Sequence, residues 1–420
     1  MPAFERQTHG IYRDLKILEL GSGAAGPVST RYFAEQGAHV VRVESAKRPD
    51  FLRLLNLTKD SPKGLRPLDS ALMFVLLNPD KDSVSLNTTT PEGLALLKRL
   101  ALWADVVAEN FSPGVVAKWG LDYETLRAEK PDLVMVSGCL FGQTGPQRKY
   151  PGFGGQGSAI SGFNHLTGWP DREAHGPYAT ITDSLSPRYV AAALAAALLQ
   201  KKRTGQGQYI DVSQIETAVY SLSEPMVRFS TEGESDVRRG NHNEWVAPHA
   251  IYRCRPEDGP HGSVERWIAI ACPSDGAWQR LVSEMGRPSW ATRAELAAVA
   301  GRLEKQEELD REIDAWTAER EAYALMRQLQ DAGVEAGVVQ NFADLSQDPQ
   351  LAARGHFVTL SHEYLGELAF ERSAVRLAEH ASSLRRPGPK LGEHNSDVLG
   401  GVLGLTEAEI ADLVARDVVV

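Results

Sequence analysis

Short apolar strands alternate with helical segments through the first two hundred residues, and this alternation limits the fold more than any other feature. Strand-like runs occur at 15–20, 39–44, 105–109, 133–137 and 208–213. A helix is predicted over 28–36, and another begins at Thr90, with Pro91 in its first position. Strands that alternate with helices build a parallel sheet with helices on both faces. The sequence therefore predicts an α/β fold with a doubly wound sheet.

The pattern changes near residue 230. Residues 231–236 are charged and rich in turn formers, which indicates a linker. After it come a strand at 267–271, a helix at 275–285, a mostly helical stretch at 304–331 and a strand at 336–339. We interpret this stretch as a smaller α+β domain. Beyond it, a strand is expected at 358–360 and a capped helix at Thr406.

Composition and charge argue against several classes of protein. The 420 residues include 45 Lys and Arg against 55 Asp and Glu, a net charge of -10, so we expect no nucleic-acid partner. The longest apolar run, 190–199, is too short to span a bilayer, and residues 1–6 lack the apolar core of a signal peptide. Cys139, Cys254 and Cys272 are widely separated, which predicts neither a metal cluster nor a disulfide framework and favours the cytoplasm.

A glycine-rich loop follows the first strand. The run Gly21-Ser22-Gly23-Ala24-Ala25-Gly26 fits G-x-G-x-x-G, opens a helix, and is followed by Glu44 at the end of the next strand. In this context the pattern favours a nucleotide at the positive end of the helix. Pro27 removes an N–H group that a pyrophosphate would use. Three interpretations stay open: an NAD or FAD site, a site for a different ligand, or a tight turn.

Two further segments lie where parallel strands end. The run 109–114 could bind a ligand through the Asn110 amide and the Phe111 ring, with the Lys118 ammonium further along the chain. The alternative is an ordinary turn before a helix. The glycine-rich stretches 142–146 and 152–157 are typical of phosphate cradles, acyl pockets and ordinary loops alike.

Asp183 stands before the most apolar helix of the chain. Free N–H groups and the positive helix end would keep such a carboxylate ionised at neutral pH, ready to act as a nucleophile. The alternative interpretation is an aspartate that caps the helix.

Taken together, these segments resemble family III CoA-transferases, the group of the formyl-CoA, carnitinyl-CoA and benzylsuccinyl-CoA transferases. The matching pieces follow the family's order over nearly the whole chain: 41–44, 78–83, 109–114, 141–146, 166–171, the Asp183 segment, 203–208, 240–241, 247–248 and 387–394.

The resemblance implies a Rossmann-like large domain made from both chain ends. Residues 1–229 would form its N-terminal part, followed by a linker at 230–245 and the small domain at 246–340. Residues 341–420 would contain a return linker and the C-terminal part of the large domain. Two chains would thread through each other as interlocked rings, either as a homodimer or with a homologous subunit. The resemblance implies no permanently bound cofactor, since coenzyme A or its acyl thioester is the substrate.

The resemblance also assigns the site. Asp183 would be the catalytic nucleophile and would form an aspartyl-acyl anhydride. The residues that would bind CoA are Ala24, Arg42, Asn110, Phe111, Lys118 and Cys139. The acyl pocket would contain Gly154, Gly155, Gln156, His242 and Asn243.

Departures from the formyl-CoA pattern bear on the substrate. Ala24 replaces a glutamine, Cys139 replaces a lysine that contacts CoA, and the family's flexible glycine loop has no clear counterpart. The run 176–189 looks more like the branch that acts on aryl dicarboxylates such as benzylsuccinate, with succinyl-CoA as the donor.

Three alternatives remain at this level. The first is an NAD- or FAD-dependent oxidoreductase that uses the Gly21–Gly26 loop. The second is a non-catalytic CoA-binding subunit, although the presence of Asp183 argues against it. The third is an acyl-CoA racemase, which would need a His/Asp pair drawn from His165 or His175.

Overall fold

The computed structural model describes residues 10–55, 67–259, 262–380 and 382–420. Within it the chain forms two compact units. The large unit is built from Met1–Asn164, Gly176–Ser235 and Gln350–Val420, and the small unit from His165–His175 and Asp236–Pro349. The small unit thus reaches beyond the predicted 246–340 on both sides and gains 165–175. Residues 1–6, for which the sequence predicts no signal peptide, lie outside the described residues.

The large unit contains a six-stranded sheet in the order β3-β2-β1-β4-β5-β6, with every neighbouring pair parallel. Its strands are β1 (Lys16–Leu20), β2 (His39–Glu44), β3 (Asp82–Ser85), β4 (Val106–Glu109), β5 (Val134–Cys139) and β6 (Gln208–Ser213). The predicted doubly wound α/β sheet is confirmed. Only β3 was missed, because the sequence Asp-Ser-Val-Ser offers no apolar run, although all four of its residues are buried.

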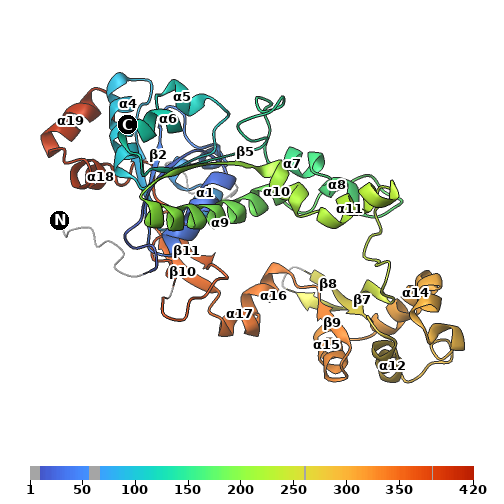
Figure 1. The fold of residues 1–420 in the computed structure, drawn as a ribbon. Coiled ribbons are helices and arrows are strands. Elements are labelled where there is room, and N and C mark those ends of the chain that lie inside the picture. The colour runs from blue at the N-terminus through green and yellow to red at the C-terminus, as the bar shows by residue number, and fades with distance from the viewer. Residues whose placement is uncertain (1–9, 56–66, 260–261, 381) are drawn as a thin grey trace. The chain divides into compact units, whose positions relative to one another are not determined.

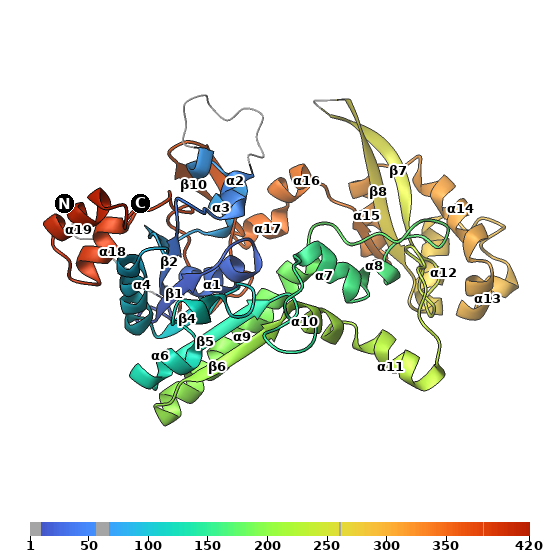
Figure 2. The same cartoon turned by 90° about the horizontal axis from the view of Figure 1, so that it is seen from above.

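Helices cover both faces of this sheet (Figures 1 and 2). The helices of the large unit are α1 (Ala25–Glu35), α2 (Phe51–Leu54), α3 (Leu72–Leu77), α4 (Pro91–Trp103), α5 (Val115–Lys118), α6 (Tyr123–Glu129), α7 (Gly154–Ile160), α9 (Ile181–Thr204), α10 (Gln214–Tyr220), α11 (Ser223–Glu232), α18 (Asn395–Gly401) and α19 (Glu407–Ala415), with a 3-10 turn at Pro67–Asp69. The helix predicted at 28–36 begins three residues earlier, and the predicted linker at 231–236 begins inside α11. Helices α8 (Phe163–Leu166) and α17 (Pro349–Ala353) lie where the chain passes between the units.

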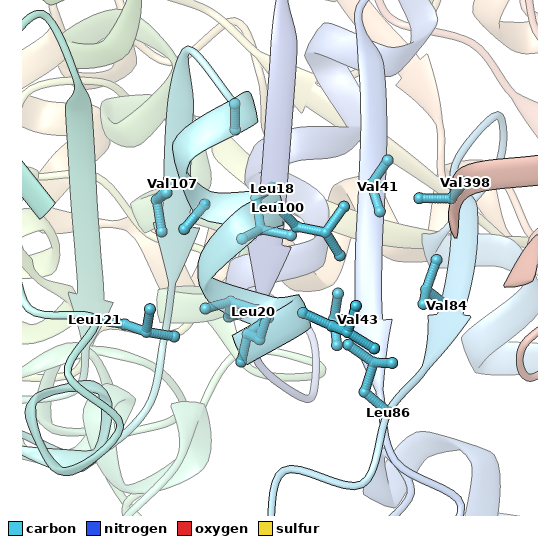
Figure 3. Close-up of a cluster of buried hydrophobic side chains, with 14 of the residues drawn as sticks. Leu18, Leu20, Val41, Val43, Val84, Leu86, Leu100, Val107, Leu121 and Val398 are labelled. Carbon is cyan, nitrogen blue, oxygen red and sulfur yellow. The ribbon is translucent and has the colours of Figure 1, made fainter. Parts of the chain in front are cut away.

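Alternate residues of β1, β2, β4 and β5 pack into two separate cores. Leu18 and Val41 pack with Leu100 of α4 and Val398 of α18 on one face, as Figure 3 shows. Ile17, the neighbour of Leu18, packs instead with residues of α1 and α9 on the other face. Strands buried on both sides are what a parallel sheet requires. This sandwich fixes the carboxyl ends of the strands, where the loops of interest begin.

The C-terminal part of the chain completes the large unit. It contributes the hairpin β10 (Phe357–His362) and β11 (Gly366–Glu371) as well as α18 and α19, in agreement with the strand and helix expected there. Leu86 forms a bridge with Val419, and Arg386 donates to Asp82 at 2.9 Å. The expectation that both chain ends build one unit therefore agrees with the structure.

The small unit is an antiparallel three-stranded sheet with helices, as the predicted α+β class requires. Its elements are β7 (His249–Gly259), β8 (Gly262–Ala271), β9 (Glu335–Val338), α12 (Asp275–Glu284), α13 (Val299–Glu304), α14 (Gln306–Thr317), α15 (Ala322–Asp331), α16 (Phe342–Gln347) and a 3-10 turn at Ala294–Leu296. Its core includes Trp278, Tyr252 and Ile268. Strand β7 was not predicted because Pro256 interrupts its pattern, and the pairing with β8 shifts register there.

Candidate active site

The site begins where the strand order of the sheet reverses. Strand β1 lies between β2 and β4, so the connections that follow β1 and β4 diverge and leave a crevice at their carboxyl ends. Asn110, after β4, spans it: its Oδ1 accepts from the Ser22 N–H at 3.0 Å, and its Nδ2 donates to the Ser22 carbonyl at 2.8 Å. A Cβ atom would lie 1.9 Å from Asn110 Oδ1 at Gly21 and 2.8 Å from Asn110 Cγ at Gly26. These glycines therefore make room for the Asn110 side chain.

The N–H groups that a dinucleotide pyrophosphate would use are already bonded within the protein. The Ser22 N–H is held by Asn110, and the Gly23 N–H lies 3.1 Å from both carboxylate oxygens of Asp50. Pro27 has no N–H. Rossmann enzymes bind the pyrophosphate through such donors. The loop geometry therefore does not support the NAD or FAD alternative.

A buried ion network lies beneath this loop. Arg42, with 0% exposure, pairs with Glu19 and Asp50 and lies 3.7 Å from Glu44. Lys81 donates to Glu19 at 2.7 Å. Burial by itself raises the pKa of Glu19, but the charges of Lys81 and Arg42 lower it to about 2. Arg42 was expected to bind CoA; the structure instead encloses its guanidinium in this network, where it supports the loop.

Asp183 lies inside α9, in its first turn. The helix begins at Ile181 and its N-cap is Thr180, so the interpretation of Asp183 as a capping residue is wrong. Gly154, the first residue of α7, sits against the carboxylate: a Cβ atom there would lie 2.5 Å from Asp183 Oδ2. A glycine at this position brings the backbone of α7 up to the Asp183 carboxylate.

Asp183 is partly buried, and the groups that bond its carboxylate are neutral. Burial raises the pKa of Asp183, and hydrogen bonds with the side chains of Thr180 and Gln214 oppose that rise. The net direction is therefore upward from the ordinary aspartate pKa, because the desolvation cost exceeds the effect of these hydrogen bonds. Among the described residues no cation forms an ion pair with Asp183. The result is a weakly solvated carboxylate held by neutral donors.

A pocket of about 170 Å³ joins Asp183 to the glycine loop. It brings together four of the predicted site residues, namely Ala24, Asn110, Cys139 and Asp183. Burial, together with the charges of Glu109 and Asp211, raises the pKa of the Cys139 thiol to about 11, so this wall of the pocket is neutral at physiological pH.

Other predicted residues lie elsewhere. The Phe111 ring packs edge-on against Trp119 with 5.4 Å between ring centroids, and Lys118 is exposed at the end of α5. Gln156 Oε1 accepts from the Phe153 N–H at 3.1 Å and caps α7, next to Gly155. None of these residues lines the Asp183 pocket. His242 and Asn243 line a second pocket, which lies within the small unit.

Sequence reasoning did not assign several of the residues that line the Asp183 pocket, among them Gln214, Phe51 and Arg148. Gln214 follows β6 directly, at the carboxyl end of a strand, and this position is the signal that could have identified it. Phe51 and Arg148 also line the pocket; Phe51 begins the short helix α2 and Arg148 lies in a turn, and neither stands in a recognisable sequence pattern.

The pocket also bears on the remaining alternatives. No histidine lines it in the part of the chain that the structure describes. The two candidates, His165 and His175, belong to the small unit. Within the described ranges no group of His, Cys, Asp and Glu is arranged to hold a metal ion. None of the described helices combines the length and the apolar character needed to cross a membrane.

Comparison with known proteins agrees with this geometry. Residues 12–395 match the sequence model of the family described as CoA-transferase family III. The chain is 36% identical to the succinyl-CoA--D-citramalate CoA-transferase of Chloroflexus aurantiacus, covering 97% of each chain. It is 30% identical to the succinate--glutarate CoA-transferase of Agrobacterium fabrum, covering 92% of this chain and 94% of the relative. A CaiB/BaiF family protein from Brucella suis has a similar structure, with a TM-score of 0.83, 30% identity and coverage of 94% and 100%.

Proposed function

Because the chain belongs to CoA-transferase family III, we propose that Asp183 is the nucleophile with which it moves coenzyme A from an acyl-CoA thioester to a free carboxylic acid. The observation that carries this assignment is the position of Asp183: a partly buried carboxylate with no ion-pair partner among the described residues, in a pocket that reaches the crevice of a parallel sheet. Such crevices are where ligands bind in these folds.

The proposed reaction exchanges one activated acyl bond for another. An oxygen of the Asp183 carboxylate attacks the thioester carbonyl, forming a C–O bond and releasing CoA thiolate, which leaves a mixed anhydride. The thiolate then attacks the aspartyl carbonyl, releases the donor acid and forms an aspartyl-CoA thioester. The acceptor carboxylate attacks this thioester and frees the thiolate. The thiolate finally attacks the acceptor carbonyl, which restores the Asp183 carboxylate.

The groups around Asp183 suit these steps. Burial leaves the carboxylate poorly solvated, which favours attack, and it also protects an anhydride from water. Gln214 and Thr180 orient the carboxylate through neutral hydrogen bonds, so they do not neutralise it. We propose that the backbone of Gly154 and Gly155, or the N-terminal turn of α9, donates to the oxyanions of the tetrahedral intermediates.

We propose that CoA lies along the glycine loop. Ala24, Asn110 and Cys139 line the pocket from that side, which is the support for their assignment. Phe111 and the exposed Lys118 are proposed as contacts outside the pocket, with Lys118 facing a phosphate. Gln156, His242 and Asn243 remain proposals for the acyl side.

For the substrates we propose succinyl-CoA as the donor and a small dicarboxylate as the acceptor. The names of the two relatives above pair succinyl-CoA or succinate with citramalate or glutarate, both dicarboxylates. An aryl-substituted acceptor such as benzylsuccinate stays a proposal within the same class.

A panel of acyl-CoA donors and free acids, read by mass spectrometry, tests this function. We expect a new acyl-CoA whose acyl group comes from the acid, formed in equal amount to the donor acid released. Release of CoA without a new thioester would show a hydrolase and contradict the proposal. Exchange of the α-proton without transfer would favour the racemase.

We propose that the chain works as an interlocked dimer in the cytoplasm. The supporting observation is an exposed apolar surface on α10 and α11, where Tyr220, Met226, Val227 and Phe229 are each more than half exposed. A second copy is the partner we favour, although relatives named as alpha and beta subunits of an L-malate transferase keep a homologous partner open. Light scattering should show a dimer that persists at nanomolar concentration, whereas a folded monomer would refute the interlocked arrangement.

A further inference from the structure

Gln214 is held in the wall of the Asp183 pocket where β6 ends and α10 begins. It is the first residue of α10, is only 6% exposed, and lines the same pocket as Asp183. The Ser213 hydroxyl before it caps α10, and the Ile215 N–H after it donates to the Leu140 carbonyl at 3.2 Å. The backbone is therefore fixed on both sides of Gln214, so its side chain starts from a defined point in the pocket wall.

The two polar atoms of the Gln214 carboxamide differ in their partners. The hydrogen bond between Gln214 and Asp183 lowers the pKa of that carboxyl, which identifies Nε2 as the donor. Oε1 is buried and has no hydrogen-bond partner in the described part of the chain. A buried acceptor without a donor costs free energy, and native proteins usually supply a protein group, a water or a ligand. The pocket thus contains an unused acceptor beside the proposed nucleophile.

This acceptor lies close to the reacting atoms. The oxygen and nitrogen of a carboxamide are roughly 2.2 Å apart, and an N–H···O bond spans about 2.9 Å. Gln214 Oε1 is therefore at most about 5 Å from the Asp183 oxygen that Nε2 contacts. A carbonyl carbon in position for attack lies about 3 to 3.5 Å from the nucleophile. A substituent one or two carbons along the acyl chain is thus within reach of Oε1.

The strand order separates Gln214 from the glycine loop. That loop follows β1 and Gln214 follows β6, with β4 and β5 between them. Neighbouring strands are about 4.8 Å apart, so three such steps separate the two ends of the pocket. With CoA along the glycine loop, as proposed above, Gln214 belongs to the end of the pocket that is left for the acid.

The charge of Asp183 restricts the chemistry of the missing donor. An unsubstituted dicarboxylate is ionised at neutral pH and has no O–H or N–H group to offer. An ammonium group would pair with Asp183 and satisfy the charge that has to attack the thioester. A hydroxyl donates one hydrogen bond and carries no charge. It can therefore satisfy Gln214 Oε1 and leave the Asp183 carboxylate reactive.

We propose that the acid activated by this enzyme carries a hydroxyl group one or two carbons from its reacting carboxyl, and that Gln214 Oε1 accepts a hydrogen bond from it. The proposal rests on the function proposed above and makes Gln214 a determinant of substrate specificity. The competing donor is an amide N–H of CoA, which is present in every thioester substrate. The test must separate these two donors.

The test uses the full-length enzyme with succinyl-CoA as the donor. The acceptors are glutarate, 3-hydroxyglutarate and each enantiomer of 2-hydroxyglutarate, which differ only in the hydroxyl. Gln214→Met has a similar size and removes a buried unsatisfied acceptor, so it should fold. Thr180→Val is the matched control, because the Thr180 side chain also bonds Asp183. Both variants weaken the hold on Asp183, but only Gln214→Met removes the proposed acceptor.

In the wild-type enzyme we expect kcat/KM for at least one hydroxyglutarate to exceed that for glutarate about 5- to 50-fold. Gln214→Met should bring this ratio close to one and slow transfer to every acceptor. Thr180→Val should also slow transfer to every acceptor but keep the wild-type ratio. Calorimetric titration of the CoA-bound protein with the same acids should show the same ratios in Kd, so the comparison does not depend on turnover.

Three results would overturn the proposal. The first is a wild-type enzyme that prefers no hydroxyglutarate over glutarate. The second is a preference that persists in Gln214→Met or that Thr180→Val removes to the same extent. The third is an equal loss for all acceptors in Gln214→Met together with weaker binding of free CoA, which would assign Oε1 to a CoA amide.

Failure of the proposed function would look different. It would appear as the absence of CoA transfer to any acid of the wider panel described above. The ratios of Kd would still test the role of Gln214, so the two failures can be told apart.

Discussion

Two groups of buried acids lie at the same edge of the parallel sheet, and they differ in what surrounds them. In β1, Glu19 is paired with Arg42 of β2 and with Lys81, and its pKa falls to about 2. Toward β4, β5 and α9, burial raises the pKa of Glu109 to about 7 and also raises that of Asp183. The first group has cations within ion-pair distance, and the second has only neutral donors.

This difference in ion-pair partners shows what decides whether a carboxylate in the sheet has a structural or a chemical role. Paired charges satisfy one another, so they hold the glycine loop but cannot attack a substrate. A carboxylate held by neutral donors keeps its nucleophilic oxygen, at the cost of a raised pKa. We therefore expect mutations of the paired group to change stability and mutations of the unpaired group to change catalysis or its pH dependence.

The largest effect should come from Asp183→Asn. The amide keeps the size of the side chain and much of its hydrogen bonding but cannot form the anhydride, so transfer should fall at least about 1000-fold. Coupled mass-spectrometric assays with succinyl-CoA would measure this loss, and CoA binding should be nearly unchanged by calorimetry. Turnover at the wild-type rate would remove Asp183 from the mechanism.

Arg42→Met should break the paired group. It leaves Glu19 and Asp50 buried with less compensation, which typically costs about 3–5 kcal/mol of the free energy of unfolding. Urea unfolding would measure it, with exposed Arg127→Met as the matched control. If Arg42→Met left stability intact and weakened only CoA binding, Arg42 would be a ligand contact after all.

Glu109→Gln should change how the free energy of unfolding depends on pH, which no mutation of the paired group is expected to do in the same way. In the folded protein burial raises the pKa of Glu109 from 4.5 to about 7, so the folded state holds a proton that the unfolded chain releases earlier. The stability that this proton contributes is present at low pH and is lost as pH rises through about 7. Glu109→Gln should avoid that loss and gain about 3 kcal/mol relative to wild type between pH 5 and pH 8.

Urea unfolding at both pH values measures this gain, and exposed Glu129→Gln is the control. A difference between Glu109→Gln and wild type that stayed constant with pH would mean that a cation or water already compensates Glu109.

The smallest effect is expected at Lys118, which belongs to neither group. If its ammonium meets a phosphate of CoA, Lys118→Ala should weaken CoA binding by roughly 1 kcal/mol, about fivefold. Calorimetric titration with CoA would measure it against Lys98→Ala, an exposed lysine of α4. Equal affinity in the two variants would leave Lys118 as an ordinary surface residue.

Sequence reasoning predicted the sheet well because β1, β2, β4 and β5 are buried on both faces and are therefore mostly apolar. It predicted β2 and β6 residue for residue, but it missed β3, which is polar, and β7, which contains Pro256.

For the candidate site, the sequence identified the loops that end parallel strands, and Ala24, Asn110, Cys139 and Asp183 do line one pocket. It could not show that Arg42 is enclosed by acids from other segments, since such long-range pairing leaves no local pattern. For the same reason Gln214, which bonds Asp183 from another helix, was not identified.

The large unit is assembled from three separate stretches of chain, and this matters during synthesis on the ribosome. Its packing is not finished until Val419 bridges Leu86 and Arg386 reaches Asp82. At about 5–20 residues per second, the stretch after Ser235 takes roughly 10 to 40 s to translate. Throughout that time the part of this sheet face that α18 and α19 cover stays open, and Asp82 lacks Arg386. A chaperone that shields this face during translation should therefore raise the yield of active enzyme more than one added after release.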